Sequence, residues 1–115
     1  MIKIKRIYES AATDDGFRVL VDRLWPRGLS KENAKVNLWL KDIAPSNDLR
    51  KWFHNNQEKW KKFQIKYQKE LEANKELVNK IKQIEKEKRI VTLLYSSTDK
   101  EHNNAIVLSA ILKKL

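Results

Sequence analysis

RIVTLLY, residues 89–95, is the clearest buried strand in the sequence, because large apolar and β-branched side chains follow one another almost without interruption. Two more strands are predicted nearer the N-terminus. Residues 2–8 (IKIKRIY) alternate apolar and basic side chains with the period of two typical of a half-buried strand. Residues 17–24 (FRVLVDRL) have a buried middle, and the turn at residues 25–28 (WPRG) ends them because proline supplies no backbone donor.

Helical periodicity fills the sequence between these strands. Residues 30–43 are expected to form a helix capped by the serine at their start. Aromatic and aliphatic residues recur at helical spacing over residues 49–71, with an interruption near 54–56, and a second stripe predicts a helix that ends near residue 88. The pattern TDKE at residues 98–101 is that of a capping box and predicts the start of a last helix.

Strands separated by helices favour parallel pairing with helices on the faces of the sheet. The predicted fold class is therefore α/β: a small, mostly parallel sheet flanked by helices in a three-layer, Rossmann-like arrangement. Residues 1–115 fit one domain, because 115 residues of which 41% are hydrophobic supply one packed core. No internal repeat or linker divides the chain.

Composition excludes several classes of site. The chain has no cysteine, which rules out disulfides and thiol nucleophiles, and its two histidines show no metal-ligand spacing, so no metal is expected. Only two glycines occur, so phosphate-binding and dinucleotide-binding loops are absent. No apolar run approaches the roughly 20 residues of a membrane span, and the first residues lack the apolar stretch of a secretory signal. A cytoplasmic location without membrane contact is expected.

The net charge of +10 raises the alternative of a nucleic-acid partner. Most lysines lie between residues 59 and 88, where they alternate with glutamates in the way that solvated helix faces do. A nucleic-acid-binding or regulatory module that uses these helices is therefore the second hypothesis. Self-association through exposed tryptophans is a third.

Polar side chains follow the second predicted strand at the edge where ligands gather in open α/β sheets. They are Asp22, Arg23, Trp25 and Arg27. A guanidinium binds phosphate or carboxylate through two parallel hydrogen bonds, and Arg27 lies in a turn that would fix its position. Trp25, beside a proline, is the aromatic residue most expected to touch a ligand. The alternative for Asp22 and Arg23 is an ion pair that ties a loop.

The last predicted strand ends at Tyr95 and leads into a helix whose first turn is expected to hold His102 and Asn103. If the two strands are neighbours, both groups of side chains converge near a helix N-terminus that favours an anion. Tyr95 and Asn103 would hold the ligand, although Asn103 could equally cap the helix. His102 is a candidate general acid or base, or an exposed first-turn residue. Arg50 and His54 share a helix face, as an anion-binding pair or an ordinary surface pair.

The sequence resembles the DUF488 family in its YeaO-like branch. The likeness begins at Asp15-Gly16, runs through residues 18–28 (RVLVDRLWPRG) and continues to the last helix; its most specific part is residues 22–28 (DRLWPRG). It extends through these further positions: Trp39, Lys41, residues 44–46, Leu49, Arg50, residues 52–54, Trp60, Phe63, Tyr67, residues 93–95, His102, Asn103 and Ala105. The resemblance implies a small stand-alone three-layer α/β domain, and no particular activity or cofactor. The lysine-rich and asparagine-rich stretch over residues 64–88 departs from what the family leads us to expect.

Together the residues predict a pocket for a small anionic ligand, such as a phosphate-bearing metabolite or a nucleotide. In this hypothesis Arg23 and Arg27 neutralise the anion, His102 transfers a proton and Asp22 orients an arginine. Whether the protein acts on the ligand as an enzyme, which cofactor it uses and what its oligomeric state is stay open at this point.

Overall fold

Four parallel strands form a single sheet in the order β1-β4-β2-β3. The computed structural model describes residues 1–115. Its strands are β1 (Ile2–Arg6), β2 (Phe17–Leu20), β3 (Leu38–Trp39) and β4 (Val91–Tyr95). Its helices are α1 (Lys31–Ala34), α2 (Asn47–His54), α3 (Trp60–Ala73), α4 (Lys75–Lys88) and α5 (Asn104–Lys113), with 3₁₀ turns η1 (Thr13–Asp15) and η2 (Lys41–Ile43).

The strand β4 lies between β1 and β2 and is buried over its whole length. Its register sets Leu93 opposite Ile4 of β1, and Leu94 opposite Leu20 of β2. A strand covered on both faces needs mostly apolar side chains, which is why it was recognisable from sequence. Its one polar residue, Thr92, is buried and donates a hydrogen bond to the Asp15 carbonyl. The three predicted strands are confirmed, with shorter bounds.

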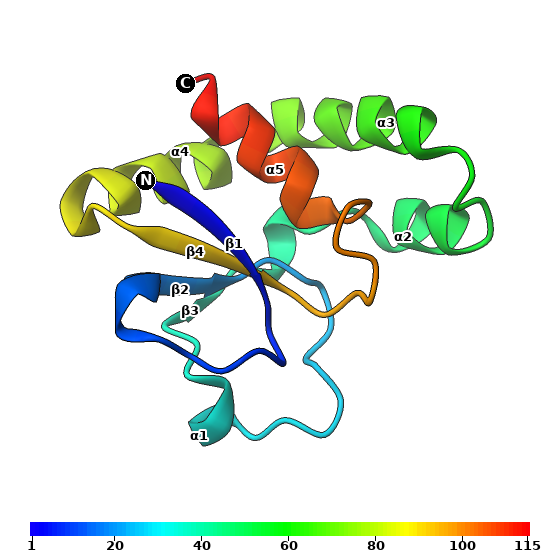
Figure 1. Cartoon of the computed structure of the whole chain (residues 1–115). Coiled ribbons are helices and arrows are strands. Elements are labelled where there is room, and N and C mark those ends of the chain that lie inside the picture. Colours follow the sequence, from blue (N-terminus) through cyan, green and yellow to red (C-terminus); the bar gives the residue numbers. More distant parts are fainter.

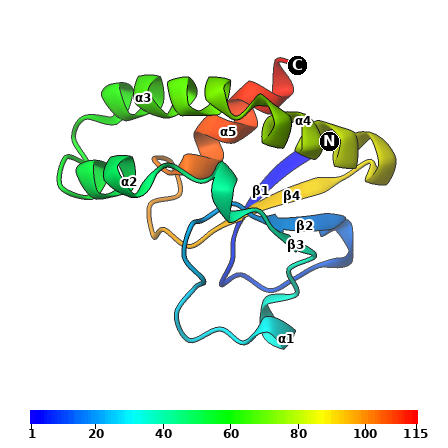
Figure 2. The same ribbon diagram turned by 180° about the vertical axis from the view of Figure 1, so that it is seen from behind.

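The chain reverses its direction of travel across the sheet at β3, and this reversal produces three layers. The connection from β2 to β3 contains α1, and the return from β3 to β4 contains α2, α3 and α4. Right-handed crossovers that run in opposite directions must cover opposite faces. Figures 1 and 2 show α2 to α5 on one side of the sheet and α1 on the other. The three-layer α/β fold is thus confirmed, with a thin third layer.

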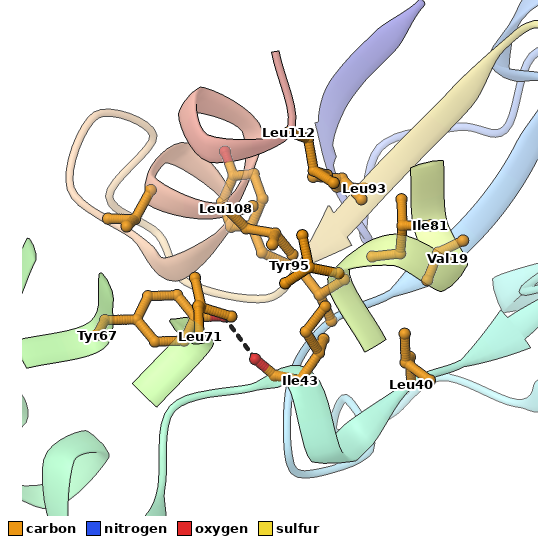
Figure 3. Close-up of a cluster of buried hydrophobic side chains, with 14 of the residues drawn as sticks. Val19, Leu40, Ile43, Tyr67, Leu71, Ile81, Leu93, Tyr95, Leu108 and Leu112 are labelled. Atoms are coloured by element: carbon orange, nitrogen blue, oxygen red, sulfur yellow. Dashed lines mark hydrogen bonds between the residues drawn. The ribbon is translucent and has the colours of Figure 1, made fainter. Parts of the chain in front are cut away.

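The larger hydrophobic core fills the space between the sheet and the helices α2 to α5. Figure 3 shows side chains of β2, β4, α3, α4 and α5 meeting there, together with Ile43. The buried Tyr67 hydroxyl donates a 2.7 Å hydrogen bond to the Ile43 carbonyl, so the polar end of this ring is satisfied inside the core. A smaller cluster on the opposite face contains Ile7, Leu20, Ala34 and Leu94.

The helix predicted over residues 30–43 is wrong beyond its first turn. Ser30 caps α1 as expected, since its hydroxyl accepts a hydrogen bond from the Asn33 N–H. Lys35 then adopts a left-handed conformation, with φ of 49°, which ends the helix after four residues. The next residues pair with β2 as the edge strand β3, a gain in tertiary hydrogen bonding that overrides local helical periodicity.

The last helix also begins later than the capping-box pattern predicted. It starts at Asn104, and the Asn103 side chain caps it by accepting a hydrogen bond from the Ile106 N–H. Asp99 instead accepts hydrogen bonds from the Glu101 and His102 N–H groups, which closes a separate turn. His102 and Asn103 therefore precede the helix rather than forming its first turn. The two predicted helices over residues 49–71 and up to 88 are confirmed as α2 to α4, with the break after His54.

The two glycines allow a matched test of the close contact between Gly16 and Ile90. Gly16 has φ of 64°, and a Cβ there would meet the Ile90 carbonyl oxygen and lie 2.6 Å from Ile90 Cβ. Gly28 has φ of 73°, with nothing within 4 Å of a Cβ. We expect Gly28→Ala to cost about 1 kcal/mol of unfolding free energy, from backbone strain alone. Gly16→Ala should cost about 3 kcal/mol or more, because overpacking adds to that strain. Urea denaturation measures both, and equal costs would contradict the close contact.

Candidate functional site

A cavity of about 460 Å³ lies at the carboxyl ends of β2 and β4. Beyond these ends β2 leads towards α1 on one face of the sheet, and β4 leads to α5 on the other. Neighbouring strands that diverge in this way leave a crevice, the position where open α/β sheets bind ligands. The lining comes from residues 22–24, residues 44–45, one side of α2, Gln57, Phe63 of α3, residues 96–99, and residues 102–104 at the start of α5.

Asp22 joins the two strand ends at the base of the cavity. Its Oδ2 accepts hydrogen bonds from the Ser96 N–H and from the Ser96 hydroxyl, both at 2.8 Å. Its Oδ1 accepts a 3.2 Å bond from Asn104 Nδ2, which also donates to the Val21 carbonyl. Burial raises the pKa of Asp22, while these hydrogen bonds act in the opposite direction. Asp22 thus orients a serine and an asparagine, and makes no ion pair with an arginine.

Arg23 is fixed in the cavity wall by main-chain oxygens. Its Nε donates to the Pro45 carbonyl at 3.1 Å and its Nη2 to the Ala44 carbonyl at 3.3 Å. The exposed Asp42 carboxylate is 3.9 Å from Nη1, a separation at which an exposed pair adds little. The guanidinium therefore supplies a half-buried positive charge of set position beside the cavity.

Arg50 differs from Arg23, because no acceptor is in reach of its buried Nε. It lies on the cavity side of α2 with Phe53 and His54, which follow it at the helical spacings of three and four residues. None of the ion pairs in the molecule includes Arg50. A buried donor without a partner costs about 1–3 kcal/mol, and the Arg50 Nε is such a donor at the edge of the cavity.

His102 has an acidic partner. Its Nδ1 is 3.2 Å from Asp99 Oδ2, and its ring packs against Trp60 with centroids 4.9 Å apart. Hydrogen bonds from the Glu101 and His102 N–H groups lower the pKa of Asp99, so this carboxyl holds its charge beside the imidazole. The sequence reasoning missed Asp99. The three-residue spacing between Asp99 and His102 was the feature of the sequence that could have indicated this pair.

The other three predicted site residues do not line the cavity. Arg27 is exposed outside the cavity, and its carbonyl accepts a 2.8 Å hydrogen bond from the Tyr8 hydroxyl. Trp25 packs edge to face against Trp39, with centroids 5.4 Å apart, and donates to the Leu29 carbonyl. Tyr95 is buried in the larger core. Of the eight predicted site residues, the cavity therefore brings together five: Asp22, Arg23, Arg50, His102 and Asn103.

Asn103 lines the cavity but is engaged in structure. Its side-chain oxygen caps α5, and its Nδ2 donates to the Asp99 carbonyl at 2.9 Å. Phe53 and Asn104 are among the lining residues that were not predicted as site residues. No group of three or more His, Cys, Asp or Glu side chains is placed to hold a metal ion. None of the helices has the length and apolar character needed to cross a membrane.

Comparison with known proteins places the whole chain in one family. A family model described as the inactive DUF488-N3 subclade matches residues 1–115. Uncharacterized protein YeaO of Escherichia coli is 40% identical over 114 residues, which cover 99% of this chain and 98% of YeaO. Uncharacterized proteins of Mycobacterium tuberculosis and Mycobacterium bovis are 47% identical over 70 residues. That alignment covers 61% of this chain and only 59% of the mycobacterial proteins. No solved structure matches the chain.

The pKa of Asp22 predicts a pH dependence of stability. Because burial raises this pKa above its ordinary value of 3.8, the folded protein holds the Asp22 proton more tightly than the unfolded chain does. The resulting stabilisation is complete below about pH 3.8 and is lost as the pH rises through the folded-state pKa. We expect the unfolding free energy of the wild type minus that of Asp22→Asn to increase as the pH falls from about 7 to about 4.

Urea denaturation of both proteins at each pH measures this difference. Carboxyl groups that titrate elsewhere in the chain are common to the two proteins and cancel. A difference that stays flat or decreases towards low pH would show that the pKa of Asp22 is not raised.

Proposed function

This chain belongs to the DUF488 family, and on that premise we propose that it binds a small anionic ligand in the cavity between the ends of β2 and β4. Arg50 is the residue that holds the anion. The matching family model is described as inactive, which supports binding without turnover. The proposal places the protein in the cytoplasm, where phosphate-bearing metabolites are found.

The buried, unpartnered Nε of Arg50 carries the proposal. A guanidinium keeps its charge at every physiological pH, so it cannot escape burial by losing a proton. An anion in the cavity would supply acceptors for the Arg50 guanidinium, since a phosphate or carboxylate can accept two hydrogen bonds from one guanidinium.

The other charges around the cavity support an anionic ligand. Arg23 adds a second positive charge that main-chain carbonyls hold in place. The two carboxylates that line the cavity already accept hydrogen bonds from the protein: Asp22 from Ser96 and Asn104, and Asp99 from the turn at His102. These carboxylate oxygens therefore already have donors, whereas the buried Nε of Arg50 has no acceptor.

The volume of the cavity suits a metabolite. Sites for small molecules typically measure about 300–1,000 Å³, and this cavity of about 460 Å³ lies within that range. The lysines of α3 and α4 do not line it. Binding at the cavity and binding of nucleic acid to the lysine-rich helices are consequently separable by mutation.

Paired substitutions of Arg50 and Arg27 test the proposal. Thermal unfolding is followed with a panel of phosphates, nucleotides and organic acids. A ligand at one hundred times its dissociation constant stabilises a fold by about 2.7 kcal/mol, or about 10 °C for a domain of this size. Arg50→Met should abolish this shift. Without ligand its unfolding temperature should equal or exceed that of the wild type, because an unsatisfied buried donor has been removed.

Arg27→Met is the matched control, since the same change is made at an exposed arginine outside the cavity. It should keep the full ligand-induced shift. A shift that survives in Arg50→Met, or a panel without any shift, would contradict the proposal. Salt-sensitive binding of DNA that depends on the α3 lysines and not on Arg50 would favour the nucleic-acid hypothesis instead.

A further inference from the structure

We infer that the ligand combines a flat ring with its anionic group, and that a nucleoside monophosphate is the class that fits. In this assignment Arg50 binds the phosphate and Phe53 packs against the base. The inference rests on the proposed function and specifies the ligand of the same cavity. It is carried by the order of side chains on α2 and by the aromatic packing behind them.

One side of α2 presents a cation and an aromatic ring to the same cavity. Arg50 and Phe53 are three residues apart and both line it. Positions with this spacing have Cβ atoms about 5–6 Å apart on a helix surface. Side chains on successive turns therefore face different parts of one ligand. A pentose between a phosphate and a base would occupy the interval between guanidinium and ring.

Phe53 belongs to a stack of rings that holds it in place. It packs on Phe63 with centroids 4.2 Å apart and an interplanar angle of 23°. Phe63 in turn stacks on Trp60 at 5.6 Å, and Trp60 contacts His102 from the loop across the cavity. Phe53 is half-buried and still borders the cavity. Because neighbouring rings already restrict its rotation, little side-chain entropy is lost when a base packs against it.

The volume and the lining both exceed what an inorganic anion needs. A phosphate ion would occupy a small part of about 460 Å³. Hydroxyl and amide side chains also border the cavity, at Ser97, Thr98 and Gln57. Such groups suit the hydroxyls of a sugar and the polar edge of a base. Stacking tolerates any of the four bases, so the structure assigns the class of ligand and not its base.

Calorimetric titration of the full chain with four probes tests this assignment. The probes are a set of nucleoside monophosphates, ribose 5-phosphate, adenosine and inorganic phosphate. At least one monophosphate should bind about tenfold or more tightly than ribose 5-phosphate, since loss of base–aromatic stacking has an effect of that size. Adenosine should bind weakly, because it lacks the group that Arg50 holds.

The Phe53→Leu variant distinguishes the contribution of the base to binding from that of the phosphate. It should weaken binding of the monophosphate about tenfold while leaving the affinity for ribose 5-phosphate unchanged. The unchanged affinity would also show that the variant is folded. Tyr8→Leu, at an exposed aromatic residue outside the cavity, is the control and should alter neither affinity.

The outcomes distinguish this inference from the proposed function. Arg50-dependent binding of ribose 5-phosphate or phosphate that equals the binding of every monophosphate would overturn the ring assignment and leave the anion site standing. Adenosine that binds as tightly as its monophosphate would overturn the assignment of the phosphate to Arg50. Absence of binding by every phosphate compound would overturn both.

Discussion

The pairing of β2 with β4 is the constraint on which the candidate site depends. The two strands run side by side, but their continuations lead to opposite faces of the sheet, and the crevice between those continuations is the cavity. Asp22 fastens the two ends together through Ser96 and Asn104. Separating them would leave a buried carboxylate without donors, which is far more costly than losing one neutral hydrogen bond. The base of the cavity is therefore tied to both strand ends by side-chain hydrogen bonds.

Side-chain hydrogen bonds also fix the helical side of the cavity. Glu70 of α3 accepts hydrogen bonds from both the N–H and the hydroxyl of Ser46, while the same hydroxyl caps α2. Tyr67 reaches the Ile43 carbonyl just before this segment. These contacts set where α2 begins and therefore where Arg50 lies. A site whose side chains are already fixed in this way has a smaller entropic cost of ligand binding.

The parts of the fold that were predictable from sequence are those in which local pattern and burial agree. β4 is almost entirely apolar because both of its faces are covered, and α3 and α4 carry one apolar stripe each. Most of the residues that follow β2 and β4 were also predictable as site candidates, since they lie where such sheets place ligands. Only tertiary pairing explains β3, since two residues carry no periodicity of their own.

Arg50 was recognisable from the sequence as a cation on a helix face, but only the folded structure shows that its Nε has no acceptor. Arg27 and Tyr95 follow or end the expected strands, but their side chains do not enter the cavity. The turn directs the Arg27 side chain to solvent, and the alternation of side chains along β4 directs Tyr95 into the core.

The position of β4 in the chain affects how the protein is made. β4 is an inner strand of the sheet, yet it consists of residues 91–95, so β1 and β2 have no strand between them while the ribosome is still translating the first 90 residues. During that interval the edges of β1 and β2 that pair with β4 in the folded protein have no partner, and the helices α3 and α4 lack the central strand of the sheet that they cover. Contacts as distant as Ile2 with Val91 must then form late and together. We therefore expect the sheet to complete only after β4 has been synthesised, and unpaired strand edges of this kind favour edge-to-edge association until then.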